Sequence, residues 1–226
     1  LAISVNFQQF GISAYPAGAA AEARSGFITA LYVVFVPLLS FFFGKKVSPV
    51  IWASVAIAVV GFYMLCLSGG ISGIYTADIL VFICAFCFAG QIISVDKFVG
   101  LTGGVKLSVM QFTVAGALSA VFAVIFERPT MENIIAAAPQ ILYLGIVSSG
   151  VGYTLQIVGQ KYAEPSVASL SMSLESVFAA LGGWLISGNT LSVREFIGCA
   201  LVFAAIVVAQ IPEMTGKTRK QSASQQ

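Results

Sequence analysis

Glu175 is the charged residue best placed to do chemistry, because it stands at the middle of a long apolar segment. It lies midway along residues 165–186, which otherwise carry no charge. An ionised side chain at the centre of a bilayer costs about 2.5–3.5 kcal/mol, roughly the contribution of six leucines to membrane insertion. We therefore expect Glu175 to face a buried polar cavity, where it binds a proton, a cation or a cationic group of a solute. The alternative is a neutral or hydrogen-bonded carboxyl group that only fixes helix packing.

Neutral polar residues recur at helical spacing in neighbouring segments. Ser149, Tyr153, Gln156 and Gln160 follow one another at intervals of four, three and four, which places them on one helical face. Such hydroxyls and amides suit a polar, mostly uncharged cavity, although each could instead bond to a neighbouring helix. Besides Glu175, the residues predicted to line this cavity are Tyr32, Tyr153, Gln156, Gln91, Gln111 and Thr29.

The cysteines give little support for metal or enzyme chemistry. Cys84 and Cys87 form a CxxC pair, but the chain has no histidine and no second thiol pair to complete a zinc site. Cys66 and Cys199 also lie in apolar segments, where a thiol behaves as a small packing residue. We predict no metal, no cofactor and no catalytic residue. An intramembrane enzyme, which would need a pair of catalytic groups, is the less favoured interpretation.

The elements that position these residues must lie in lipid. The chain is 58% hydrophobic and 9% charged, with a mean hydropathy of +0.97. Soluble domains carry roughly 25% charged residues, so this composition predicts a membrane protein. Charge-free stretches are long enough for the roughly 20 helical residues that cross a bilayer, whereas strands of a membrane barrel would alternate polar and apolar residues.

Seven complete transmembrane helices are predicted, in an all-α polytopic membrane protein. Residues 1–12 are apolar but too short to cross, so we expect them to be the end of a further helix whose beginning is absent. The predicted spans are residues 25–43, 49–68, 79–95, 107–126, 139–160, 165–186 and 196–211.

Basic residues predict the orientation of the spans. Eight of the eleven lysines and arginines fall in the loops and tail on one side, and three fall on the other. The positive-inside rule identifies the richer side as cytoplasmic, so the C-terminal tail is expected in the cytoplasm. The tail is too weakly basic to indicate nucleic-acid binding.

A faint internal repeat relates the first and last pairs of spans. A shift of 144 residues aligns Ser25 with Ser169, Val33 with Val177, Gly44 with Gly188, Ser48 with Ser192 and Ala56 with Ala200. The span at 165–186 comes five crossings after the span at 25–43. Because five is odd, the second copy must be inverted in the membrane. Lys45 and Lys46 in the first connecting turn correspond to Asn189 and Thr190 in the second, as an inverted copy requires.

Three stretches resemble the EamA family of the drug/metabolite transporter superfamily. They read FITALYVVFVPLLSFFFG at 27–44, YLGIVSSGVGYTLQIVGQKY at 143–162 and SLSMSLESVFAALGGWLISG at 169–188. The chain departs from the family at both hairpin turns, where Lys45 and Asn189 replace a frequent glutamate.

The resemblance implies a ten-helix fold of two inverted five-helix repeats around a central cavity. On that basis residues 1–70 hold the end of helix 3 with helices 4 and 5, residues 77–212 hold helices 6 to 10, and residues 213–226 form the cytoplasmic tail. The implied function is a secondary transporter, permease or exporter, that moves a small polar metabolite or drug-like solute across the bacterial inner membrane. A lipid-handling or structural membrane protein is the alternative.

Overall fold

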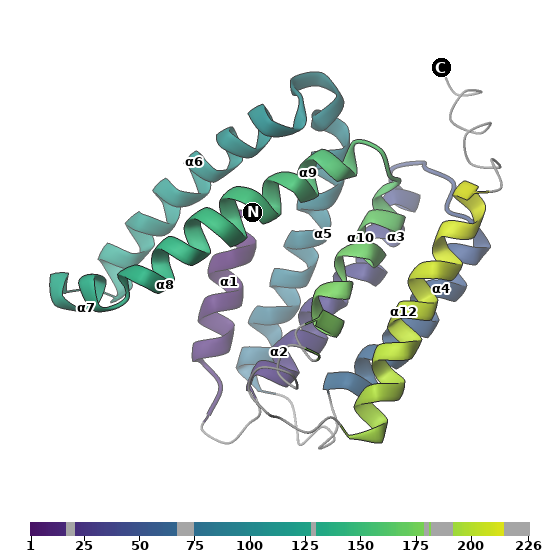
Figure 1. The fold of residues 1–226 in the computed structure, drawn as a ribbon, viewed down its shortest axis with the longest axis horizontal. Coiled ribbons are helices and arrows are strands. Elements are labelled where there is room, and N and C mark those ends of the chain that lie inside the picture. Colours follow the sequence, from purple (N-terminus) through teal and green to yellow (C-terminus); the bar gives the residue numbers. More distant parts are fainter. Residues whose placement is uncertain (17–20, 67–74, 128–129, 179–180, 182–191, 215–226) are drawn as a thin grey trace.

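The computed structural model describes residues 1–16, 21–66, 75–127, 130–178, 181 and 192–214, and the ordered elements in these ranges are all helical (Figure 1). Their bounds are α1 Ala2–Ser13, α2 Ala21–Ala30, α3 Tyr32–Phe42, α4 Pro49–Cys66, α5 Thr76–Thr102, α6 Gly104–Phe122, α7 Met131–Ala136, α8 Ala138–Leu142, α9 Thr154–Gln160, α10 Pro165–Met172 and α12 Val193–Met214. Two π-helical segments, η1 Ala123–Glu127 and η2 Tyr143–Tyr153, continue α6 and join α8 to α9.

Six helical stretches among the described residues are long and apolar enough to cross a membrane. They are Arg24–Phe42, Pro49–Cys66, Thr76–Thr102, Gly104–Phe126, Ala138–Gln160 and Val193–Ile211. Six of the seven predicted spans are therefore confirmed as helices of spanning length. For the remaining one, predicted at 165–186, α10 covers the beginning, while residues 179–180 and 182–186 lie outside the described residues.

Helix α5 is longer than predicted. The span was expected to stop at Val95 because Asp96 and Lys97 follow it, but the helix continues to Thr102 and ends at Gly103, whose φ of +81° favours glycine. The prediction failed because a helix can leave the hydrocarbon and continue into water. Asp96 in this extension pairs with Lys45 beyond the end of α3.

The first complete span is interrupted at Leu31, between α2 and α3. The Leu31 N–H bonds three residues back, to the Ile28 carbonyl oxygen at 3.1 Å, and the Leu31 carbonyl accepts from Val34 at 2.9 Å. The Leu31 carbonyl oxygen also accepts the ordinary α-helical bond from the Phe35 N–H at 3.1 Å, so the departure from the α-helical pattern is local. Pro37 lies inside α3, which continues through it.

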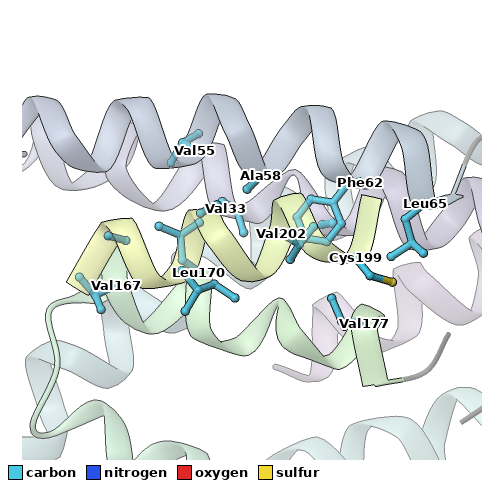
Figure 2. Packing of buried hydrophobic residues seen from close by; sticks show 14 of the residues in the cluster. Val33, Val55, Ala58, Phe62, Leu65, Val167, Leu170, Val177, Cys199 and Val202 are labelled. Atoms are coloured by element: carbon cyan, nitrogen blue, oxygen red, sulfur yellow. The ribbon is translucent and has the colours of Figure 1, made fainter. Parts of the chain in front are cut away.

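The main core joins α4 to α12 and is shown in Figure 2. It gathers Val55, Ala58 and Phe62 of α4 against Val202 of α12, with Val33 and Leu170 from α3 and α10. Helix α6 and η2 lie away from this core, on the far side of α5 (Figure 1). The spans that contain them, Gly104–Phe126 and Ala138–Gln160, have almost no buried residues. The described helices thus pack densely on one side of α5 and sparsely on the other.

Helices α4 and α12 pack closely, and their buried residues correspond to one another under the shift of 144 positions. Gly61 and Gly198 approach so nearly that added β-carbons would overlap the other helix. Ser54, Ala58 and Gly61 of α4 are all buried, and so are the three α12 residues that stand 144 positions later in the sequence. These later residues are Gly198, Val202 and Ala205.

Candidate functional site

Glu175 follows a break in the helical segment that begins with α10. Helix α10 ends at Met172, Ser173 forms a turn, and residues 174–178 are helical again. The Ser173 hydroxyl donates to the Leu170 carbonyl oxygen at 2.5 Å and so takes up a backbone acceptor at this turn. The Glu175 side chain is exposed, not buried as expected, because no other described element covers it. An exposed carboxylate at this position is open to a solute or a proton.

Two of the predicted tyrosines stand on spans that neighbour α10. Tyr32 is the first residue of α3, immediately after the break at Leu31, and α3 contacts α10. Tyr153 is the last residue of η2, and α9, which follows it, also contacts α10. Since Glu175 lies on the helical segment after α10, the structure places three of the predicted site residues on neighbouring elements.

The depth of these residues corresponds to the middle of a bilayer. At about 1.5 Å per residue, Tyr32 lies about 15 Å from the end of α3 at Phe42. Glu175 lies about 15 Å from the beginning of α10 at Pro165 by the same measure. With Phe42 and Pro165 at the edges of a hydrocarbon core about 30 Å thick, both residues would stand near its midplane.

Four more of the predicted residues carry buried polar atoms without a hydrogen-bond partner. Gln91 of α5 is 7% exposed, yet neither its amide oxygen nor its amide nitrogen is bonded. The same holds for Thr29 Oγ1, Gln111 Oε1 and Gln156 Nε2. A buried polar group without a partner costs about 1–3 kcal/mol, so native proteins rarely leave one without a reason.

The three glutamines belong to helices that contact one another. Helices α5, α6 and α9 pack around Val95, Val99 and Ile157. Gln91 stands one helical turn from Val95, and Gln156 precedes Ile157 in the chain. Next to Gln111, the Phe112 ring meets Tyr153 edge to face, with ring centroids 6.1 Å apart. The unbonded amides therefore lie on the same group of helices that carries Tyr153.

Sequence reasoning missed three buried polar residues and misjudged one stripe. Ser4, Ser40 and Gln160 are buried and each has an unbonded oxygen, but they were not selected as site residues. For Gln160 the available signal was its place in the helical stripe that begins at Ser149. Ser149 belongs to the π-helical η2, so the α-helical spacing that linked it to Gln156 does not apply through that segment.

No group of three histidine, cysteine, aspartate or glutamate side chains that could hold a metal occurs within the described part of the chain. Cys84 and Cys199 are buried among packed helices. The polar groups of the candidate site are therefore one carboxylate, two phenol groups and several neutral amides.

Comparison with known proteins relates the chain to a transporter family, a sequence relative and a solved structure. The model of the EamA-like transporter family matches residues 75–210. A protein of Archaeoglobus fulgidus described as an uncharacterized transporter is 31% identical over 189 residues, which cover 83% of this chain. The chain spans only 60% of the length of that relative. A crystal structure described only as that of a protein has a similar fold, with a TM-score of 0.72 and 20% identity. The match covers 92% of this chain and 73% of that one.

Proposed function

Because the chain belongs to the EamA-like transporter family, we propose that it carries a small polar solute across the membrane through the site around Glu175. The observation that supports this site most strongly is the packing of α3 and α9 against α10, which gathers the elements that carry or adjoin Tyr32, Tyr153 and Glu175. Tyr32 directly follows the break at Leu31, and Glu175 stands two residues after the turn at Ser173. Transporters commonly bind their solutes near the bilayer midplane, between interrupted helices.

The fold we propose is the ten-helix inverted repeat, of which this chain supplies seven complete spans and part of another. Residues 1–70 would belong to the first repeat, 77–212 to the second and 213–226 to the tail. Two features support the repeat. A shift of 144 residues moves the break at Leu31 onto Glu175, which is two positions after the break at Ser173. The buried residues of α4 and α12 follow the same shift.

The orientation we propose places Lys45, Lys97 and the C-terminus in the cytoplasm, with the protein in a bacterial inner membrane. The basis is the division of lysines and arginines, eight on this side against three on the other. The first-repeat turn at Lys45 and Lys46 would then face inward.

The solute we propose is a cation or a polar molecule with a cationic group, and Glu175 binds this group or a proton in its place. No lysine or arginine stands in the middle of a span to neutralise Glu175. A proton or a bound cation would therefore supply the compensating charge. The Tyr32 and Tyr153 rings add faces that attract cations. Unbonded amides at Gln91, Gln111 and Gln156 would meet neutral donors and acceptors of the solute.

The test is solute flux in lipid vesicles that contain the full-length protein. A panel of radiolabelled cationic, zwitterionic, anionic and neutral solutes is presented with and without a pH gradient. Saturable flux of a cationic or zwitterionic solute is expected, and its absence in vesicles with Glu175→Gln would assign it to this site. Lipid scrambling without solute flux would favour the lipid-handling alternative. Flux confined to anionic solutes would contradict the proposed role of Glu175.

A further inference from the structure

Two ion pairs tie the same two spans together, one at each end. The span Arg24–Phe42 runs alongside α5 (Figure 1), and both of its halves contact that helix. Arg24 at one end pairs with Asp78 in the first turn of α5. Lys45, just beyond the other end, pairs with Asp96 near the end of α5. The site residue Tyr32 lies between these two connections.

The Arg24 pair is buried and has additional partners. The side chains of Arg24 and Asp78 are 7% and 11% exposed, and Arg24 Nη2 lies 2.6 Å from Asp78 Oδ2. Asp78 also accepts from the Tyr15 hydroxyl at 2.6 Å and from the Tyr75 backbone N–H at 2.8 Å. The Arg24 guanidinium stands over the Tyr75 ring, 4.8 Å from its centroid.

The phenol proton of Tyr15 is held in this cluster. Burial, and then the hydrogen bond to Asp78, raise the pKa of Tyr15 above its ordinary value. The hydroxyl thus remains a donor throughout the physiological pH range, and it connects the end of α1 to the beginning of α5. Separating Arg24 from Asp78 would leave buried charges without partners, which is strongly unfavourable.

The Lys45 pair is exposed and simple. Lys45 Nζ lies 2.5 Å from Asp96 Oδ2, and the two side chains are 51% and 24% exposed. This is the one hydrogen bond that the described residues give to either side chain. Water replaces such a contact at little cost, and salt screens it. The two ends of the helix pair are thus held with unequal strength.

The break at Leu31 lets the two ends behave separately. Helix α2 carries Arg24 and contacts α1, α4 and α5, whereas α3 leads into Lys45 and packs against α4, α5 and α10. A change of backbone angle at Leu31 would move α3 without separating Arg24 from Asp78. Hinges are typically a few residues at the end of an element.

We propose that the Lys45–Asp96 pair is the gate of the transport site and that the Arg24 cluster is a fixed clamp at the other end. When the gate pair separates, α3 swings at Leu31 and opens the half-buried region of Tyr32 and Ser176, beside Glu175, on the Lys45 face. The inference rests on the proposed function for the meaning of the gate, but the separation itself is a property of the folded chain and can be measured without flux.

The experiment uses the full-length protein, with its native cysteines replaced and a reporter cysteine at Ser176 beside Glu175. The rate of labelling by a water-soluble maleimide measures how often the site opens. Lys45→Ala should raise this rate about two- to fivefold, the range expected from loss of an exposed ion pair. The charge exchange Lys45→Asp with Asp96→Lys should restore the original rate. Lys46→Ala is the matched control and should leave labelling unchanged.

Two further measurements test the clamp and the electrostatic origin of the effect. Raising the salt concentration should increase labelling of the parent protein but not of Lys45→Ala. Asp78→Asn should lower thermal stability without raising the labelling rate of the folded fraction. Should Asp78→Asn fail to fold, Tyr15→Phe takes its place with the same expectation. Unchanged labelling in Lys45→Ala would overturn the proposal, and so would a labelling increase in the folded clamp variant that equals that of Lys45→Ala.

A failed transport assay would leave this result intact, because labelling requires no solute. Conversely, if Lys45→Ala leaves the labelling rate unchanged in a protein that transports solute, the gate proposal is contradicted and the transport proposal is not. The two proposals can therefore fail separately.

Discussion

Gly61 of α4 and Gly198 of α12 cross at a distance that leaves no room for a side chain between them. A β-carbon on Gly198 would lie 2.7 Å from the Gly61 carbonyl oxygen and 2.8 Å from the Leu65 nitrogen. One on Gly61 would lie 2.9 Å from the Gly198 carbonyl oxygen. Helix association in lipid depends on such close backbone approach, because burial of apolar surface provides little driving force there.

Gly198→Ala should destabilise the protein by about 1–3 kcal/mol, since the added methyl group must push two helix backbones apart. Gly116→Ala in α6 is the matched control, because an added β-carbon there meets nothing within 4 Å. Better helix propensity should make the control neutral or slightly stabilising. The measurement is the thermal unfolding midpoint of the full-length protein in detergent, and equal midpoints for the two variants would contradict the close crossing.

Glu175→Gln keeps the size and the hydrogen-bonding capacity of the side chain but removes its titration and charge. We expect it to leave expression and thermal stability nearly unchanged, while it abolishes pH-driven flux or weakens the binding of cationic solutes. The measurement is flux in vesicles with and without a pH gradient. Unchanged rate and unchanged pH dependence would show that Glu175 is a packing element.

Gln91→Leu should separate stability from binding. Leucine removes two unbonded polar atoms from a buried position, so the unfolding free energy should rise by about 1–3 kcal/mol. Solute affinity should fall, because the amide would no longer bond to the ligand. Gln210→Leu, at an exposed position of α12, is the control. Reduced stability in Gln91→Leu would mean that the amide has a partner within the protein.

Tyr15→Phe removes the hydrogen bond to Asp78 and little else. We expect a loss of about 1.5–3 kcal/mol of stability, the usual range for a bond to a charged group. Tyr143→Phe, at an exposed position of η2, should change stability by less than about 0.5 kcal/mol. Thermal unfolding of both variants measures the difference, and a loss as small as that of Tyr143→Phe would contradict the contribution of this bond to the clamp.

Single cysteines at Leu101 and Met131 test the orientation. Both positions are exposed and lie beyond opposite ends of α6. In intact cells an impermeant thiol reagent should label Met131→Cys and spare Leu101→Cys, with both labelled after permeabilisation. The reverse pattern would place the Lys45 face outside the cell.

The sequence predicted the helical spans well because the signal is simple. Charges cannot stay in hydrocarbon, so the charge-free stretches mark the spans to within a few residues. The end of α5 was the exception, since Asp96 and Lys97 sit on a helix that has already left the apolar region. The breaks at Leu31 and Ser173 could not be predicted, because neither residue is a glycine or a proline.

The residues of the candidate site could be selected from the sequence by their type, but their exposure and their neighbours could not be predicted. Glu175, Tyr32 and Tyr153 could be selected because polar side chains are unusual inside apolar segments, and the elements that carry or adjoin them contact one another in the structure. Their binding role stays a prediction. The exposure of Glu175 and the pairing of Arg24 with Asp78 depend on which helices are neighbours, and the spacing of residues along one chain does not contain that information.

The symmetric crossing of α4 and α12 has the form of an isologous interface, the kind that two copies of one subunit make around a two-fold axis. In a homodimer every mutation appears on both sides of the axis at once. Here one chain supplies both sides, so their association does not depend on protein concentration and each side can change alone. Gly61 meets Gly198 on one side, while Ser54 and Ala205, their equivalents on the other, retain side chains. Covalent linkage has thus made possible an asymmetry that a dimer of identical subunits could not encode.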